Sequence, residues 1–368
     1  MSTLLNIRLW RVSQGSFVLK TGNLELLFCY MDKKYRNIIL FFFIFINTYG
    51  QDIHFTQFNS SPLNLNPATT GFFDGTHRFC INNRTQWRSV TVPYSTISAS
   101  VDTKILQRKL EQDMFGIGLL INKDKAGDLE FGTTQINLSV SYIKLLGKYK
   151  KHFISFAVQP GIAQRAIDYD KLAFDNQFNG FYYDSELPYN EQLGINNFMF
   201  FDLTAGVYWN YQYKKDVNVN CGISFFHLNS PRQSLLDNHN ITLNQRVAIY
   251  GNVQINTNDK INILPGILIM KQGAYKEIIF GSVFKFIKNR ESYNYTALNL
   301  GIFFRTKDAA NLILGLDYLK FNFGVSYDIN YSKLKTASKS KGGLELSIIY
   351  RINKIKQAKI RAVPCPIF

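Results

Sequence analysis

Carboxylates are the side chains whose spacing comes nearest to a chemical site in this chain. Asp124 and Asp128 flank a glycine in an expected turn, and Asp168, Asp170 and Asp175 open the longest expected loop. Carboxylate oxygens at such spacing can bind Ca²⁺. Asp and Gly also favour turns for purely local reasons. We therefore expect turns at these positions and no metal site.

Catalytic motifs give no stronger signal. The sequence has no G-x-S-x-G, H-E-x-x-H or C-x-x-C motif. Its five histidines are scattered, and none pairs with another at metal-ligand spacing: His54, His77, His152, His227 and His239. A lipase or protease would need a base near a nucleophile. We therefore expect neither an enzyme nor a cofactor.

The elements that would position these residues are β-strands, because apolar and polar residues alternate along most of the chain. In residues 135–142, Ile136, Leu138, Val140 and Tyr142 share one face, and polar residues share the other. A soluble β-sandwich alternates in the same way. The aromatic fraction of 15%, with 31 Phe and 21 Tyr, favours a membrane barrel with aromatic girdles. We predict an all-β fold, a transmembrane antiparallel β-barrel of about 14 strands over residues 77–352.

The lengths of the expected connections support this fold. Bacterial barrels have short periplasmic turns and longer outer loops, and an even strand number places both ends in the periplasm. Short connections are expected at 147–150, 214–216, 257–260 and 288–292, and longer ones at 168–197, 229–242 and 332–342. These longer connections then all lie outside, and the exception is 105–113, a moderately long charged connection on the periplasmic side. On this register Val140 faces lipid, where arginine would be harmful, and Ser139 faces the lumen, where we expect arginine to be tolerated.

The first 50 residues predict export. Residues 31–50 combine a basic start, a short apolar run and small residues before Gln51, which is the pattern of a secretory signal peptide. The apolar run is too short for a membrane helix. We expect cleavage between Gly50 and Gln51, and we interpret residues 1–30 as an extension from a wrongly assigned start codon. Together with the barrel, this predicts the cell outer membrane.

Two further segments flank the expected barrel. Residues 51–76 are irregular and rich in Asn, Ser, Thr and Pro, and we expect them to fold inward as a plug-like segment. Residues 353–368 form a basic tail expected in the periplasm, where Lys354, Lys356, Lys359 and Arg361 are candidate contacts for acidic partner surfaces.

The formal charge of +16 is compatible with nucleic-acid binding in general. Because we expect this chain to be exported, we expect no nucleic-acid partner, and we expect the charge to meet the anionic lipid and polymers of a cell envelope.

Ordered motifs along the mature chain carry a family resemblance. The opening is Gln57-Phe58, then Pro62-Leu63-Asn64-Leu65-Asn66-Pro67-Ala68 and Gly71. Further matches are Asn83-Arg84-Thr85-Gln86-Trp87, Leu172-Ala173-Phe174-Asp175-Asn176-Gln177, Ser326-Tyr327-Asp328-Ile329-Asn330 and Gly342-Gly343-Leu344-Glu345-Leu346. Each is weak alone, but in this order they resemble the PorP/SprF family of the type IX secretion system of Bacteroidetes.

The resemblance implies an outer-membrane barrel that supports protein secretion and gliding motility. The implied partners are periplasmic ring proteins, a peptidoglycan-binding lipoprotein, and an exported cargo or surface adhesin. An outer-membrane diffusion channel or fatty-acid-type transporter of similar strand number remains open as an alternative, because its strands would alternate identically.

Overall fold

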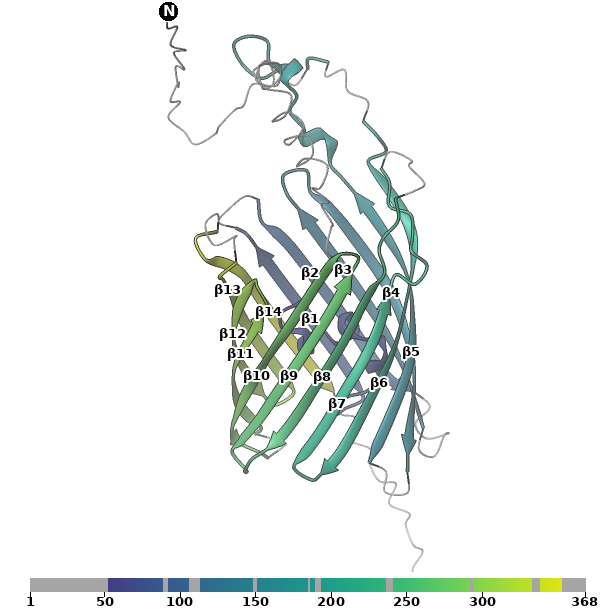
Figure 1. Cartoon of the computed structure of the whole chain (residues 1–368), viewed down its shortest axis with the longest axis vertical. Coiled ribbons are helices and arrows are strands. Elements are labelled where there is room, and N and C mark those ends of the chain that lie inside the picture. Colours follow the sequence, from purple (N-terminus) through teal and green to yellow (C-terminus); the bar gives the residue numbers. More distant parts are fainter. Residues whose placement is uncertain are drawn as a thin grey trace, which may run out of the picture. The chain divides into compact units, whose positions relative to one another are not determined.

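The structure, a computed structural model, is a closed antiparallel β-barrel of fourteen strands (Figure 1). It describes residues 52–88, 92–105, 113–147, 151–184, 186–188, 193–235, 241–291, 294–332 and 338–352. The predicted fold and strand number are confirmed. The expected cleavage site at Gly50 and Gln51 lies outside the described residues, as does the basic tail with Lys354, Lys356, Lys359 and Arg361.

Each strand pairs with its sequence neighbours, and β1 pairs with β14 to close the barrel, with His77 opposite Ile352. The strands are β1 (His77–Gln86), β2 (Tyr94–Ile105), β3 (Met114–Ala126), β4 (Phe131–Leu146), β5 (His152–Ala166), β6 (Asn197–Lys214), β7 (Val217–Phe226), β8 (Arg246–Asn256), β9 (Ile261–Gln272), β10 (Tyr275–Asn289), β11 (Thr296–Arg305), β12 (Ala309–Tyr318), β13 (Phe321–Asn330) and β14 (Lys341–Ile352).

Alternation along each strand separates an apolar outside from the lumen. On β4, Ile136, Leu138 and Val140 are 53%, 46% and 37% exposed, whereas Ser139 between them is fully buried. The outer face is apolar all round the barrel, as expected of a surface that contacts lipid. Among the described residues, no helix is long and apolar enough to span a membrane.

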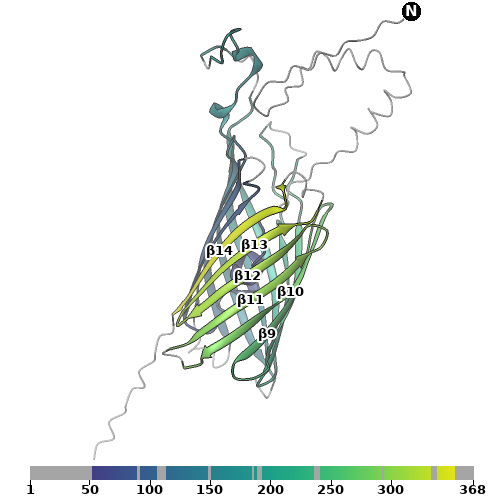
Figure 2. The ribbon, with the colours of Figure 1, turned by 90° about the vertical axis from the view of Figure 1, so that its left-hand side faces the viewer.

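The two ends of the barrel differ. Connections that follow odd-numbered strands lie at one end, and they include the three longest, residues 167–196, 227–245 and 331–340. We call this the long-loop end. Connections that follow even-numbered strands lie at the opposite, short-turn end, where β1 also begins and β14 ends. Figures 1 and 2 show the connection between β5 and β6 rising beyond the strand ends.

Candidate functional site: the lumen and its inner segment

The lumen holds residues 52–71, which we call the inner segment. It contains three single-turn elements, η1 (Phe58–Ser60), α3 (Pro62–Leu65) and η2 (Pro67–Thr69). Two of these turns begin with proline, whose fixed φ and missing N–H suit a first helical position. The sequence therefore produces a compact irregular chain here, with no strand pattern that would let it join the barrel wall.

The inner segment runs along the lumen from one end to the other. At the long-loop end, the Asp52 N–H donates to the side chain of Gln272, the last residue of β9, and the Asp52 carboxylate meets His227 just after β7. At the short-turn end, the Gly71 N–H donates 2.8 Å to Asp102 on β2. The inner segment therefore begins at the long-loop end of the lumen and leaves the lumen where β1 begins.

A first charged cluster fixes the start of the inner segment. The Asp52 carboxylate lies 3.0 Å from Nε2 of His227 and 3.2 Å from the Arg246 guanidinium, and Nδ1 of His227 lies 2.9 Å from Asp202. Arg246 also donates 2.7 Å to the carbonyl of Ile53. We call these four charged side chains the entry cluster.

In the entry cluster, the attraction between opposite charges has a larger effect on the pKa values of Asp52 and His227 than the loss of water on burial. Burial opposes the charged imidazolium of His227, but the carboxylates of Asp52 and Asp202 raise its pKa to about 9. Burial likewise works to raise the pKa of Asp52, but Arg246 and His227 hold that pKa well below its usual range. His227 and Asp52 are therefore both charged at neutral pH, and the amino-terminal end of the inner segment is bound by ion pairs.

A second charged cluster, which includes Asp328 of β13 and Glu345 of β14, binds the next residues of the inner segment. The Glu345 carboxylate accepts the N–H groups of Thr56 and Gln57, each at 2.9 Å. Beside it, Asp328 accepts from Arg305 at 2.6 Å and lies 3.2 Å from Arg84. These charged side chains are 2–3% exposed, so each depends on its partners for compensation.

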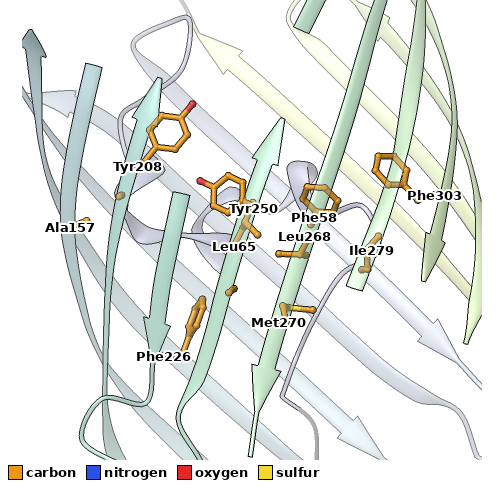
Figure 3. Packing of buried hydrophobic residues seen from close by; sticks show 12 residues of the cluster. Phe58, Leu65, Ala157, Tyr208, Phe226, Tyr250, Leu268, Met270, Ile279 and Phe303 are labelled. Atoms are coloured by element: carbon orange, nitrogen blue, oxygen red, sulfur yellow. The ribbon is translucent and has the colours of Figure 1, made fainter. Parts of the chain in front are cut away.

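Further along the inner segment, apolar packing replaces ion pairs as the main contact with the barrel wall. Phe58 and Leu65 are 4% and 7% exposed and belong to one apolar cluster with residues of β6 to β11. Phe58 meets the ring of Phe303 edge to face, with centroids 5.7 Å apart. Figure 3 shows the two segment residues beside Tyr250 and Leu268 of the wall. The wall from β6 to β11 contributes apolar side chains to this cluster between polar ones such as Asn262 and Asn299, whereas the wall from β1 to β5 is mostly polar.

Glycines on the inner face of the wall make room for the inner segment. Nδ2 of Asn66 donates 2.9 Å to the backbone carbonyl of Val207 on β6. It reaches this carbonyl because Gly206 and Gly222 carry no side chain there. A Cβ built on Gly206 would lie 2.0 Å from Asn66 Oδ1, and one on Gly222 would lie 2.6 Å from Asn66 Nδ2. Asn66 therefore fits a notch that only glycine permits.

Hydrogen bonds secure the segment at its carboxyl-terminal end. Thr70 and Ser139 share a hydroxyl–hydroxyl hydrogen bond of 2.7 Å, and Ser141 donates 2.6 Å to the Thr70 carbonyl. Asp102 accepts from the Gly71 N–H and forms a two-pronged pair with Arg78 at 2.9 and 2.8 Å. The inner segment is thus bound along its whole length.

Small cavities lie beside the inner segment. Two cavities border it, one lined by Phe58, Leu65, Leu268 and Met270 and the other by Asn137, Gln159, Asp202 and His227 among others. Each offers about 20 Å³, which suits one or two water molecules. Neither cavity is large enough for a drug-sized ligand.

The carboxylates considered as Ca²⁺ ligands have other roles. Asp124 accepts from Thr96, and Asp168 lies 3.3 Å from the Lys171 ammonium. Within the described part of the chain, no group of three or more His, Cys, Asp or Glu could hold a metal ion.

The residues that organise the lumen were not predicted as a site. The available signal was the presence of charged residues at inward positions of strands, as at Arg84, Arg305, Asp328 and Glu345. Such residues need partners when buried, but the sequence does not say which ones.

Comparisons with known proteins place the chain in a family. The model of the type IX secretion system membrane protein PorP/SprF matches residues 47–350. No curated protein matches the sequence significantly.

Three solved structures of low sequence identity are similar to this chain. The Ralstonia pickettii toluene transporter TbuX is 10% identical, with a TM-score of 0.47, covering 80% of this chain and 94% of that chain. The CymD monoaromatic hydrocarbon channel is 12% identical, with a TM-score of 0.45, covering 83% and 96%. The Pseudomonas putida toluene transporter TodX is 9% identical, with a TM-score of 0.46, covering 78% and 92%. Because the family model spans nearly the whole described barrel, this chain belongs to the PorP/SprF family of type IX secretion system membrane proteins.

Proposed function

We propose that this protein is an outer-membrane component of the type IX secretion system that supports the export or surface anchoring of cargo such as adhesins. Family membership supports the secretion role. The observation that bears on how it acts is the inner segment, bound along the lumen from Asp52 to Gly71. A lumen occupied in this way favours a barrel that works through protein contacts at its two ends.

The orientation proposed for the membrane follows from the connections. Barrels of this type carry short turns on the periplasmic side and longer loops outside. The long-loop end, with residues 167–196 and 227–245, then faces the exterior, and the short-turn end faces the periplasm. Cargo would bind at the long-loop end, and the secretion machinery would bind at the short-turn end.

A deletion in the native bacterium tests the role. We expect the surface and medium proteomes of a strain lacking this gene to lose one or a few exported proteins, and a plasmid copy to restore them. Unrelated outer-membrane and periplasmic proteins serve as the control and should stay constant. Unchanged surface and medium proteomes would refute the proposal.

The basic tail is the proposed contact with periplasmic ring proteins and a peptidoglycan-binding lipoprotein. Replacing Lys354, Lys356, Lys359 and Arg361 with Gln should leave the barrel inserted, weaken co-purification with this machinery, and reduce export. If the barrel fails to insert, the tail serves assembly. If insertion, co-purification and export are all unchanged, the tail has no role in partner binding.

The alternative, a diffusion channel or fatty-acid-type transporter, makes a different prediction. Liposomes containing the purified protein should then show steady flux of small solutes or uptake of an apolar probe. We expect neither, because the inner segment and the side chains around it occupy the lumen beside cavities of water size.

A further inference from the structure

The connection between β5 and β6, residues 167–196, differs from the rest of the protein in charge. It carries six acidic residues and one lysine in a chain whose formal charge is +16. Figures 1 and 2 show it rising from the long-loop end beyond the strand ends. We call it the outer arm. The outer arm is therefore an acidic segment of a protein that is basic as a whole.

The base of the outer arm is attached at several points. The Asp168 N–H donates 2.9 Å to the Leu129 carbonyl, and the Ile195 N–H donates 3.0 Å to the Leu235 carbonyl of the next outer connection. Lys171 bridges Glu130 at 2.8 Å and Asp168 at 3.3 Å. These contacts tie the arm to two neighbouring connections and fix the direction in which it leaves the barrel.

The tip of the outer arm, residues 178–183, is a small organised hairpin. Phe178 and Tyr183 form an isolated antiparallel bridge. Between them, Oδ1 of Asn179 accepts the N–H groups of Phe181 at 3.0 Å and Tyr182 at 3.1 Å. Gly180 supplies the positive φ of +100° that this turn requires. The tip is therefore shaped before any partner arrives, which lowers the entropy cost of binding.

This tip presents aromatic rings to solvent. Phe181 is 92% exposed, Tyr182 64%, Phe178 57% and Tyr183 48%. The rings cannot serve as membrane anchors if the long-loop end projects away from the lipid. Exposed aromatic patches of this kind mark interaction sites, because such side chains contribute most to binding when a partner covers them.

We propose that the tip of the outer arm is a docking knob for an exported protein that presents an apolar pocket bordered by basic side chains. The proposal deepens the proposed function and rests on it. Aromatic rings at the tip fill the pocket, and the acidic residues along the arm attract the basic border. The same negative charge disfavours the phosphates of an anionic lipid surface as the occupant.

The test uses the full-length protein and the exported protein whose surface level falls when this gene is deleted. In the double variant F181S/Y182S we expect binding of that purified cargo to weaken at least tenfold, as is typical when central aromatic residues are removed. The barrel should still insert, as shown by its heat-modifiable band. The matched control is Ile241→Ser, on the neighbouring outer connection, where a side chain of 48% exposure is removed.

A second variant tests the charges. Asp175→Asn combined with Glu186→Gln should weaken cargo binding at low salt and lose most of this effect at high salt. Wild-type affinity of F181S/Y182S for the cargo would overturn the docking knob while leaving the proposed function intact.

Two other outcomes would also overturn the docking knob. If deletion of the gene changes no exported protein, the proposed function and the docking knob fail together. If the wild-type protein self-associates in detergent and F181S/Y182S does not, the tip binds a second copy of this chain.

Discussion

Two parts of the inner segment lie against the same barrel wall but are held by different forces. Residues 52–57 are bound by charge: Asp52 pairs with His227 and Arg246, and Glu345 accepts two backbone N–H groups. Residues 58–69 are bound mainly by shape, and residues 70 and 71 by hydrogen bonds to β2 and β4. There Phe58 and Leu65 pack against an apolar wall, and Asn66 occupies a notch between glycines.

The difference shows where release of the inner segment would start. The stabilisation from ion pairs depends directly on pH and salt, whereas that from packing and backbone hydrogen bonds does not. The charge-held part also lies at the long-loop end, where the outer arm is. Any loosening of the inner segment should therefore begin at residue 52 and proceed toward the short-turn end.

The largest effect is expected from breaking the second charged cluster. Arg305→Met removes the partner 2.6 Å from Asp328 and leaves a buried carboxylate undercompensated. We expect a loss of about 3–5 kcal/mol in stability, measured as earlier thermal loss of the heat-modifiable band. Arg290→Met, at an exposed pair 3.5 Å from Asp259, is the control and should change little. Equal behaviour of the two variants would show that the buried cluster is not a stabilising contact.

The next prediction separates the two faces of β4. Val140→Arg places a charge on the lipid face and should cost about 2–4 kcal/mol, so less barrel should insert. For Ser139→Arg the sequence alone predicts that barrel assembly tolerates the change, and the structure adds that Ser139 is fully buried against Thr70 of the inner segment. We expect Ser139→Arg to insert normally but to expose the inner segment, measured by maleimide labelling of a Ser61→Cys background. If Ser139→Arg leaves Ser61→Cys as protected from maleimide as it is without that change, the packing of Ser139 against the inner segment is contradicted.

A third prediction addresses shape directly. In Gly206→Val the new side chain would occupy the position of Asn66 Oδ1. We expect a cost of about 1–3 kcal/mol from overpacking, with faster labelling of Ser61→Cys and little change in barrel insertion. Gly251→Val is the matched control, since a Cβ there meets nothing closer than 3.8 Å. If both variants label alike, the notch does not hold the segment.

The smallest effect is expected from pH. Attraction to the carboxylates raises the pKa of His227 to about 9, above its ordinary value near 6.5. The stabilisation is therefore complete below about pH 6.5 and is lost as pH rises through about 9. The hydrogen-exchange protection factors, which correct for the base-catalysed intrinsic rate, should fall at residues 52–57 above pH 9, with no matching change at residues 58–71. In His227→Gln this alkaline step should disappear; a step that persists would assign it to another group.

The strands could be predicted from sequence because alternation is a local property. Residues such as Ile136 and Ser139 show their faces directly, and the family motifs were also legible in the sequence. The path of the inner segment was not, because its contacts join residues far apart in the chain. Thr56 and Glu345 are 289 residues apart, and nothing local in either sequence window indicates the pairing.

The glycine notch illustrates the same limit. Gly206 and Gly222 appear in the sequence as ordinary small residues in strands. Their role appears only when Asn66, about 140 residues earlier, reaches the carbonyl of Val207. Inward glycines are therefore informative only once the chain that approaches them is known.

Whether the inner segment closes the lumen is best measured as conductance across a planar lipid bilayer. The wild-type protein should show no steady current, and a variant lacking residues 52–71 should show a stable one, because the segment that occupies the lumen is gone. A wild-type current as large as that of the deletion variant would show that the inner segment does not close the lumen and would favour an open diffusion channel.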